Sequence, residues 1–342
     1  MPFAAILLAL LALAAPAAAQ QFPAQQRGLA ADTAYQSGDL DSVNLFNGNL
    51  SLAIPLGQPY PVGPSFSLGF TLHYNSKVWD YEEKLCFQTL PTQAVPYSLP
   101  VPDKFANAGI GWLLTPGRLL DPSTFPGENP LNDGPNWVYV SSDGGHHALY
   151  PRLHPGYPAT VSTAGTLYSN DGTYLRHKKL AGSACRTPAG VSGDCRIVEF
   201  PDGSRHEFRN YRPFDWRVVR MADSFGNTVD VDYQFTGAQD LKWTFSDAHG
   251  RSQVVDFENG RIRWLKLTAF GDTTATWEFQ YQSATIPRHD YVQLSCNPAA
   301  PAVNTPVTFL TRIVRPDQSY FEFDYYRDDH ISLSGADRKS VV

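Results

Sequence analysis

Two stretches in the second half of the chain decide the fold, DSFGNTVDVDY at 223–233 and DAHGRSQVVDF at 247–257. In each, Gly follows Asp by three positions and an aromatic residue closes the unit ten positions after the Asp. Asp accepts backbone hydrogen bonds and Gly adopts positive φ, which is the chemistry of a tight turn. The residues after each turn alternate between apolar and polar, which indicates a strand. The pattern predicts a hairpin that repeats after 24 residues.

The sequence also predicts the strands that lead into these turns, at 216–220, 241–245 and 262–266. A looser third copy places Gly271 before Trp277, Phe279 and Tyr281, and a shorter version has the apolar residue six positions after Asp. A unit of this size cannot bury its own apolar face and must stack on its neighbours. The predicted repeat-turn residues are Asp143, Asp202, Gly203, Asp223, Gly226, Asp247, Gly250 and Asp317.

Composition agrees with this pattern. The chain has 342 residues, of which 42% are hydrophobic, 13% aromatic and only 18% charged, with 26 Gly and 27 Pro. This profile excludes a disordered chain, and the net charge of −6 argues against a nucleic-acid partner. Period-two runs at 50–54, 66–72 and 137–140 add further strands, and no window shows a capped helix. We therefore expect an all-β fold of repeated antiparallel hairpins, arranged as a β-sheet spiral, a shell or a stacked sandwich.

The N-terminus indicates export. Residues 1–19 form a short apolar run that ends in small residues, typical of a signal peptide cleaved after Ala19, although no Lys or Arg precedes it. An uncleaved anchor is disfavoured because the run is short and Pro16 interrupts its end. We expect a periplasmic, cell-surface or extracellular protein with no stable membrane span after cleavage. The expected regions are a flexible arm at 20–40, the β-repeat region at 41–330 and a tail at 331–342.

Four cysteines fit an oxidising compartment and allow three pairings. Cys185 and Cys195 are ten residues apart in a Gly/Pro-rich stretch and could staple a loop, which would leave Cys86 and Cys296 to close a long one. Metal binding is disfavoured because no CxxC spacing occurs. The irregular stretch at 81–107 predicts an insertion or long loop with a possible short helix at 81–85, and a second Gly/Pro-rich stretch covers 121–135.

The repeat motifs resemble those of the bacterial Rhs/YD-repeat family. The segments VNLFNGNLSLAIPL at 43–56, GIGWLLTPGR at 109–118 and FPDGSRHEF at 200–208 are similar to segments of exported members, and the resemblance spans about 41–326. The naming Tyr-Asp dipeptide is absent, since Ala222 and Ser246 precede the two Asp residues, and the toxin-releasing C-terminal core has no counterpart. The resemblance implies an N-terminal region or a short, degenerate member that forms a β-strand shell for encapsulation, surface contact or interaction, with a C-terminal or separately encoded toxin or cargo as partner.

Candidate catalytic and metal sites are few, and we predict no catalytic residue, metal or cofactor. His146 and His147 could join Asp143 at a metal, but adjacent strand residues point to opposite faces. The Asp-x-x-Gly turns could bind calcium, but each supplies a single carboxylate, which is few ligands for this ion. A glycosidase would need a carboxylate pair in a cleft. The candidate pairs are Glu199 with Glu207 and Glu278 with Glu322, while Asp230 and Asp232 fit the solvated face of a strand.

Whether the tryptophan rings are exposed or buried distinguishes two further functions. An exposed row of aromatic rings would be a sugar-stacking platform, whereas a buried row would be the interior of the repeat stack, and alternation with Arg, Lys and Thr favours burial. We therefore predict a non-enzymatic, exported β scaffold. A carbohydrate-binding β-sandwich that contacts cell-surface glycans is the alternative, followed by a secreted glycosidase. The row consists of Trp137, Trp216, Trp243, Trp264 and Trp277.

Overall fold

The computed structural model describes residues 26–29, 31, 33–89, 92–122, 137–154, 165–212, 215–288 and 303–325. For residues 82–89, 92–99, 272, 287–288 and 303–304 within these ranges, nothing is said of the side chains. Apart from two short 3-10 turns at Gly182–Ala184 and Phe270–Asp272, the regular elements in these ranges are strands, and every strand pairing is antiparallel. The all-β fold that the sequence predicts is therefore confirmed.

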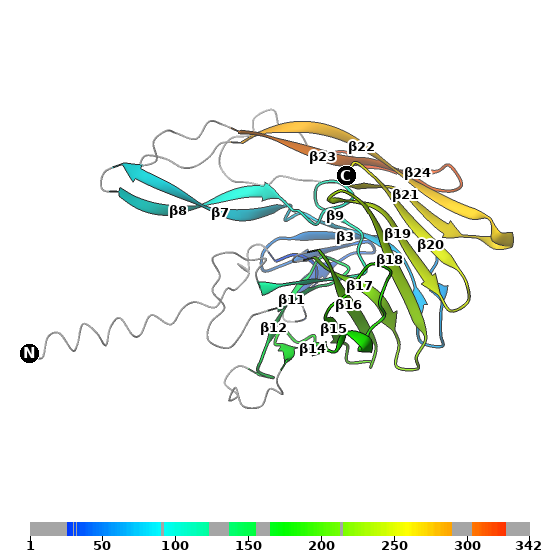
Figure 1. Ribbon diagram of the computed structural model, residues 1–342. Coiled ribbons are helices and arrows are strands. Elements are labelled where there is room, and N and C mark those ends of the chain that lie inside the picture. The colour runs from blue at the N-terminus through cyan, green and yellow to red at the C-terminus, as the bar shows by residue number, and fades with distance from the viewer. Residues whose placement is uncertain are drawn as a thin grey trace, which may run out of the picture.

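The N-terminal part contains one five-stranded sheet and two separate hairpins (Figure 1). The five-stranded sheet has the order β1-β2-β3-β6-β9. Its strands are β1 (Tyr35–Ser37), β2 (Asp41–Asn44), β3 (Leu50–Pro55), β6 (Thr71–Asn75) and β9 (Trp112–Leu113). The hairpins pair β4 (Tyr60–Pro61) with β5 (Ser67–Leu68) and β7 (Trp79–Thr89) with β8 (Thr92–Pro102).

The rest of the described chain forms one sheet of 15 strands, in which each strand pairs with the next along the chain. Its first eight strands are β10 (Arg118–Leu120), β11 (Trp137–Val140), β12 (His146–Tyr150), β13 (Thr166–Ser169), β14 (Arg176–Leu180), β15 (Cys195–Glu199), β16 (Arg205–Arg212) and β17 (Asp215–Ala222). The remaining seven are β18 (Thr228–Thr236), β19 (Gln239–Asp247), β20 (Ser252–Glu258), β21 (Arg261–Thr268), β22 (Thr274–Arg288), β23 (Val303–Val314) and β24 (Tyr320–Glu322).

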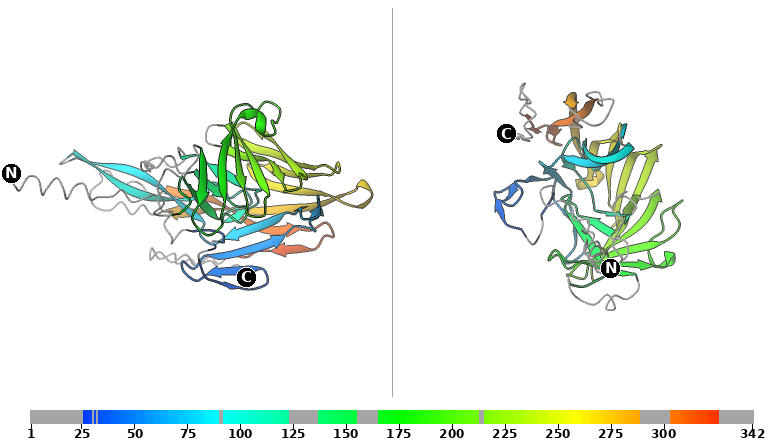
Figure 2. Two further views of the ribbon diagram at one scale, coloured as in Figure 1. Left: turned by 90° about the horizontal axis from the view of Figure 1, so that it is seen from below. Right: turned by 90° about the vertical axis from the view of Figure 1, so that its left-hand side faces the viewer.

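The sheet forks at β17. One edge of this strand pairs with β10 through Arg217 and Trp216, and further along with β18 through Arg220, Met221 and Ala222. The pairing with β10 closes β10–β17 into a ring of eight strands, which we call the cylinder. The pairing with β18 continues the sheet outward as β18–β24, which we call the extension. Figure 2 shows the extension leaving the cylinder as a broad, curved layer.

The N-terminal strands cover one face of the extension and bury its apolar residues. Phe70 packs edge-on against Phe245 at 5.0 Å, and the Tyr60 hydroxyl donates to Thr268 O at 2.6 Å. Trp112 is fully buried, and its indole N–H donates to Tyr325 Oη at 2.7 Å. Burial of this apolar surface is the main stabilising contribution to the layered part of the molecule.

Three sequence-based expectations differ from the structure. The stretch at 81–107 is not a loop with a short helix at 81–85, because most of it forms the β7–β8 hairpin. The strand expected over 66–72 divides into β5 and β6 at Gly69. The arm expected over 20–40 contains β1, and Arg27 is buried in ion pairs with Asp80 and Asp103, which anchor this segment.

Signal cleavage at Ala19, the stretch at 123–136, Cys296 and the tail at 331–342 lie outside the described residues. In the part of the chain that the structure describes, no helix has the length and hydrophobicity needed to span a membrane.

Candidate functional site

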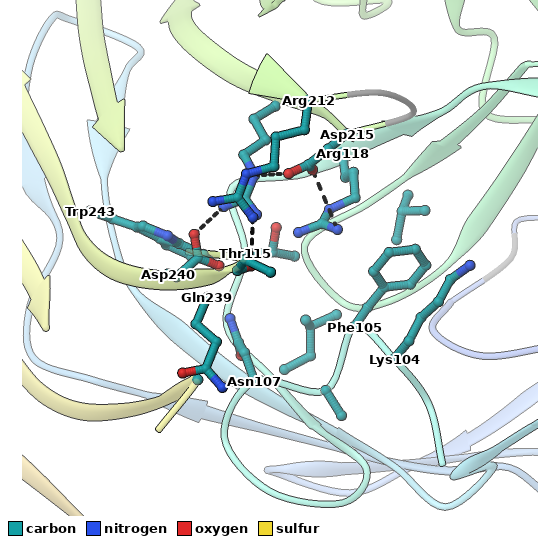
Figure 3. A pocket seen from close by; sticks show the side chains of 16 residues that line it. Lys104, Phe105, Asn107, Thr115, Arg118, Arg212, Asp215, Gln239, Asp240 and Trp243 are labelled. Carbon is teal, nitrogen blue, oxygen red and sulfur yellow. Dashed lines mark hydrogen bonds and ion pairs between the residues drawn. The ribbon is translucent and has the colours of Figure 1, made fainter. Parts of the chain in front are cut away.

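A cavity of about 370 Å³ lies where the extension leaves the cylinder (Figure 3). We call it the fork cavity. Strands β10, β17 and β19 contribute to its wall, together with the 104–107 segment that precedes β9. Its charged lining residues are Lys104, Arg118, Arg212, Asp215, Arg217 and Asp240, and the aromatic ones are Phe105 and Trp243.

Arg217 organises the charges in this cavity. Its Nε donates to Asp215 at 2.9 Å and its Nη1 to Asp240 at 2.6 Å, while its side chain is only 8% exposed. Although burial on its own lowers the pKa of Arg217, the two carboxylates raise it above the ordinary value. The ion pairs therefore compensate for the desolvation of the guanidinium. Arg212 is equally occupied, because it donates to the carbonyls of Gly237 and Ala238.

Arg118 is the exception in this network. Its closest carboxylate oxygen is Asp215 Oδ1, at 3.7 Å, which is beyond hydrogen-bond distance. The guanidinium stacks on the Phe105 ring at 4.6 Å. Burial lowers the pKa of Arg118, Asp215 raises it and Arg217 lowers it again.

The fork explains why charged residues occur in the otherwise apolar strand β17. Strand β17 runs Asp-Trp-Arg-Val-Val-Arg, and Arg118 faces Arg217 in the β10–β17 register. At this point the wall of the cylinder and the extension separate, so the side chain of Arg217 lies between them. The sequence shows only that Arg217 stands between the apolar residues Trp216 and Val218, which does not identify the partner strand.

The predicted turn residues form one recurring structure. Asp223 accepts from the N–H groups of Phe225 and Asn227, and Asp247 accepts from those of His249 and Arg251. Gly226 and Gly250 take φ of 91° and 79°, which any other L-residue would adopt only with strain.

The shorter turns accept fewer bonds. Asp202 and Asp317 are bonded by Ser204 and Ser319, and these hydrogen bonds hold the pKa of both carboxyls below the ordinary value. Gly203 is likewise at positive φ. The turns at Asp202 and Asp223 are neighbours, since a Cβ at Gly203 would lie 3.0 Å from Ser224 Cβ and Arg205 pairs with Ala222. In the described part of the chain these turns bring together no cluster of metal ligands.

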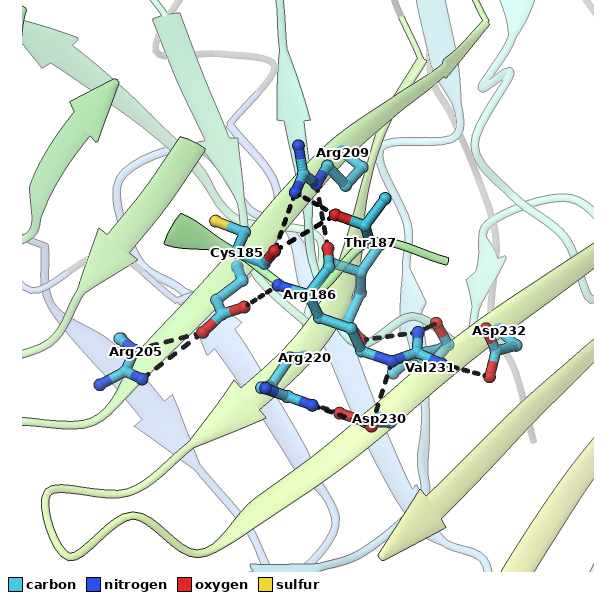
Figure 4. Close-up of polar contacts among 11 residues, drawn as sticks. Cys185, Arg186, Thr187, Arg205, Arg209, Arg220, Asp230, Val231 and Asp232 are labelled. Carbon is cyan, nitrogen blue, oxygen red and sulfur yellow. Dashed lines mark hydrogen bonds and ion pairs between the residues drawn. The ribbon is translucent and has the colours of Figure 1, made fainter. Parts of the chain in front are cut away.

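The disulfide between Cys185 and Cys195 is formed and staples the 181–194 loop to the outside of the cylinder. Figure 4 shows the polar contacts of this loop with Arg209, Asp230 and Asp232. Beneath this loop lies Arg209, only 1% exposed, whose guanidinium donates to six oxygens of the loop. These are the carbonyls of Gly182, Cys185, Arg186, Gly193 and Asp194 and the hydroxyl of Thr187. Cys86 lies in β7, and its pairing is outside the described contacts.

Asp230 and Asp232 lie on the more exposed face of β18, opposite the fully buried Val229 and Val231, and both are ion-paired. Arg186 reaches from the stapled loop to Asp230 at 3.1 Å and to Asp232 at 2.6 Å, and Arg220 also binds Asp230. The two carboxylates, 28% and 45% exposed, therefore keep the solvent contact expected of this strand face and also help to dock the loop on β17 and β18.

His146 and His147 do not form a metal pair with Asp143. His147 Nδ1 lies 2.7 Å from Asp171 Oδ2, and its Nε2 lies 3.2 Å from Ser141 Oγ. The Ser141 hydroxyl in turn donates to Asp143, so the hydroxyl proton is committed to a carboxylate. Within the described residues no three His, Cys, Asp or Glu side chains gather as metal ligands. The resulting Asp171–His147–Ser141–Asp143 chain fixes the β11–β12 turn, and no sequence motif pointed to Asp171.

The carboxylates proposed for a glycosidase are held in ion pairs on strands. Glu199 binds Arg176 and Lys178, and Glu207 accepts from the Arg186 amide at 2.8 Å beneath the stapled loop. Glu278 binds Arg263 and Glu322 binds Arg312. None of the four lines the fork cavity.

The burial predicted for the tryptophans is confirmed at four of the five positions. Trp137, Trp216, Trp243 and Trp277 are at most 7% exposed, and Trp264 is half-buried. The tryptophan row is therefore part of the packed interior and offers no exposed stacking platform.

No family model matches the chain. No curated protein matches it either. Among solved structures, the N-terminal domain of the effector protein SpvB from Salmonella typhimurium strain LT2 is similar over 81% of this chain and 94% of that chain. The identity is 11% and the TM-score 0.32, so this likeness carries no argument about function.

Proposed function

We propose that the protein is an exported, non-enzymatic β scaffold that serves encapsulation, surface contact or interaction, as the N-terminal parts of Rhs/YD-repeat shells do. The observation that carries this proposal is the continuity of the large sheet, in which every strand from β10 to β24 pairs with its sequence neighbour. A sheet that grows hairpin by hairpin provides a long, curved wall, which here is covered on one face by the N-terminal strands.

Two further observations support the proposal. The Cys185–Cys195 disulfide fits a protein that matures in an oxidising compartment. The acidic side chains that a hydrolase would need are occupied by Arg and Lys partners, which stabilise the sheet. The expected partner is a toxin or cargo, encoded C-terminally or separately, or a cell-surface glycan.

Export is tested by expressing the full chain in a Gram-negative host and separating cytoplasm, periplasm, surface and medium. We expect the mature protein to begin at Gln20 and to be recovered outside the cytoplasm with the disulfide formed. Cytoplasmic accumulation of the unprocessed chain contradicts the proposal.

The absence of catalysis is tested by incubating the exported protein with a broad panel of polysaccharides and analysing the released sugars. We expect no release. Hydrolysis by the wild type that is lost in Glu278→Gln or in Glu207→Gln, with the fold retained, would establish the glycosidase instead. Retention on a glycan array without hydrolysis would favour the carbohydrate-binding alternative.

A further inference from the structure

The fork cavity contains a guanidinium, that of Arg118, whose hydrogen-bonding capacity the described residues leave unused. Arg217 and Arg212 donate to carboxylate and carbonyl oxygens at 2.5 to 2.9 Å, whereas the nearest acidic oxygen to Arg118 is 3.7 Å away. The Arg118 side chain is 22% exposed and lines the cavity, between Asp215 and Phe105 in Figure 3. A guanidinium in this position can receive a planar, two-oxygen acceptor.

The charge of the cavity favours an anion. Four cationic side chains line it, those of Lys104, Arg118, Arg212 and Arg217, against the two carboxylates of Asp215 and Asp240. Burial and the adjacent Arg217 both lower the pKa of Arg118. A bound anion would therefore relieve a charge that the protein itself compensates only partly.

The remaining lining is polar on one side and aromatic on the other. Arg217 donates to Oδ1 of Asp240, and in the described part of the chain no hydrogen bond reaches Oδ2 of Asp240. The exposed side chain of Gln239 lies beside it, and Phe105 supplies an apolar surface. A volume of about 370 Å³ is in the range of cavities that hold small molecules.

We propose that the fork cavity binds a small carboxylate that also carries hydroxyl groups, the chemistry of a sugar acid. The ligand carboxylate accepts from the Arg118 guanidinium, and its hydroxyl groups donate to Asp240 and bond to Gln239. The carbon skeleton packs on Phe105. This inference goes beyond the scaffold function and does not depend on it, because the cavity lies at the fork between the cylinder and the extension, whatever the rest of the outer wall contacts.

Isothermal titration of the mature, disulfide-bonded protein tests the proposal, with D-glucuronate, D-galacturonate and D-gluconate as probes. D-glucuronamide is the neutral isostere, and inorganic phosphate is the competing anion. We expect saturable binding of at least one sugar acid, with the amide and phosphate at least about tenfold weaker, since charge-assisted hydrogen bonds are lost or misaligned. Equal binding of the amide or of phosphate, or no binding of any sugar acid, overturns the proposal.

Variants locate the site. Arg118→Gln should weaken binding by about 10- to 100-fold, and Gln239→Trp should block the cavity at an exposed position. Arg176→Gln, which removes a surface arginine on β14, is the matched control and should bind as the wild type. If folded Arg118→Gln binds unchanged, the assignment is wrong. If Arg118→Gln does not fold, Gln239→Trp decides, and unchanged affinity in that variant overturns the proposal.

Discussion

The cylinder and the extension are made from the same kind of hairpin, but they bury different side chains. Inside the cylinder, His177, His206 and Arg196 lie among aromatic rings, with His177 stacked on Trp137 at 5.6 Å. The extension buries a regular apolar face that includes Val255, Leu265 and Phe279, beneath the N-terminal strands. A closed sheet encloses its own interior, whereas an open sheet needs a second layer to cover it.

Each region therefore depends on a different kind of interaction. The cylinder and its stapled loop depend on polar groups that must find partners away from water, and such groups are costly when left unpaired. The extension depends on apolar area and on turn geometry. Four predictions test this difference.

The largest effect is expected at Arg209 on the cylinder. Arg209→Met removes the donor to six loop oxygens and leaves the carbonyls beneath the loop without partners, which should lower the free energy of unfolding by about 3–5 kcal/mol. The control in the extension is Arg263→Met, a partly exposed ion pair with Glu278, expected to cost less than about 1 kcal/mol. Urea denaturation measures both, and equal losses would remove the distinction between the regions.

The disulfide should contribute the next largest effect. Replacing Cys185 and Cys195 by Ala removes a cross-link between two residues that are 10 positions apart. The free energy of unfolding should fall by about 2–3 kcal/mol. Because Arg209 fixes the same loop, the loss in the triple variant with Arg209→Met should be less than the sum of the two separate losses. Strict additivity in a double-mutant cycle would show that the staple and the arginine act independently.

The sequence predicted the extension better than the cylinder, for a physical reason. The turns at Asp223 and Asp247 are local, since each Asp bonds to residues two and four positions later. Closure of the cylinder depends on Arg118 meeting Arg217, a distant pairing that no local pattern encodes. The fork cavity follows from this closure, so its residues could be recognised as charged but not as neighbours.

Prolines caused the main error of secondary structure. The β7–β8 hairpin contains Pro96, Pro100 and Pro102, which indicate a loop when read as sequence. Its sheet has only two strands, so each strand has one unpaired edge that does not require every N–H group.

The polar interior of the cylinder predicts a pH dependence. Burial, and then Arg196, lowers the pKa of His177 to about 3, and burial lowers that of His206 to about 4. In the unfolded chain a histidine takes up its proton near pH 6.5. The folded state is therefore fully stabilised above about pH 6.5 and loses stability as the pH falls from there toward the folded pKa values.

The measurement is urea denaturation of the wild type and His177→Gln at pH 7.5 and pH 5. The drop in unfolding free energy between the two pH values should be smaller in the variant by about 2 kcal/mol, since one pKa unit corresponds to about 1.4 kcal/mol. Adding His206→Gln should reduce it further. An unchanged pH dependence in both variants would show that these imidazoles are protonated in the folded cylinder.

The smallest effects distinguish the turns themselves. Asp247, in the extension, accepts two backbone N–H groups and the Arg251 guanidinium, so Asp247→Ala should cost about 1–2 kcal/mol. Asp202, in the cylinder, lies on an exposed turn and is bonded by Ser204 alone, so Asp202→Ala should cost less than about 0.5 kcal/mol. Thermal unfolding of the two variants ranks them. A larger loss of stability in Asp202→Ala than in Asp247→Ala would contradict this ranking. It would show that the short turn sets the register of its hairpin, and that the longer Asp-x-x-Gly turn forms as a consequence of strand pairing.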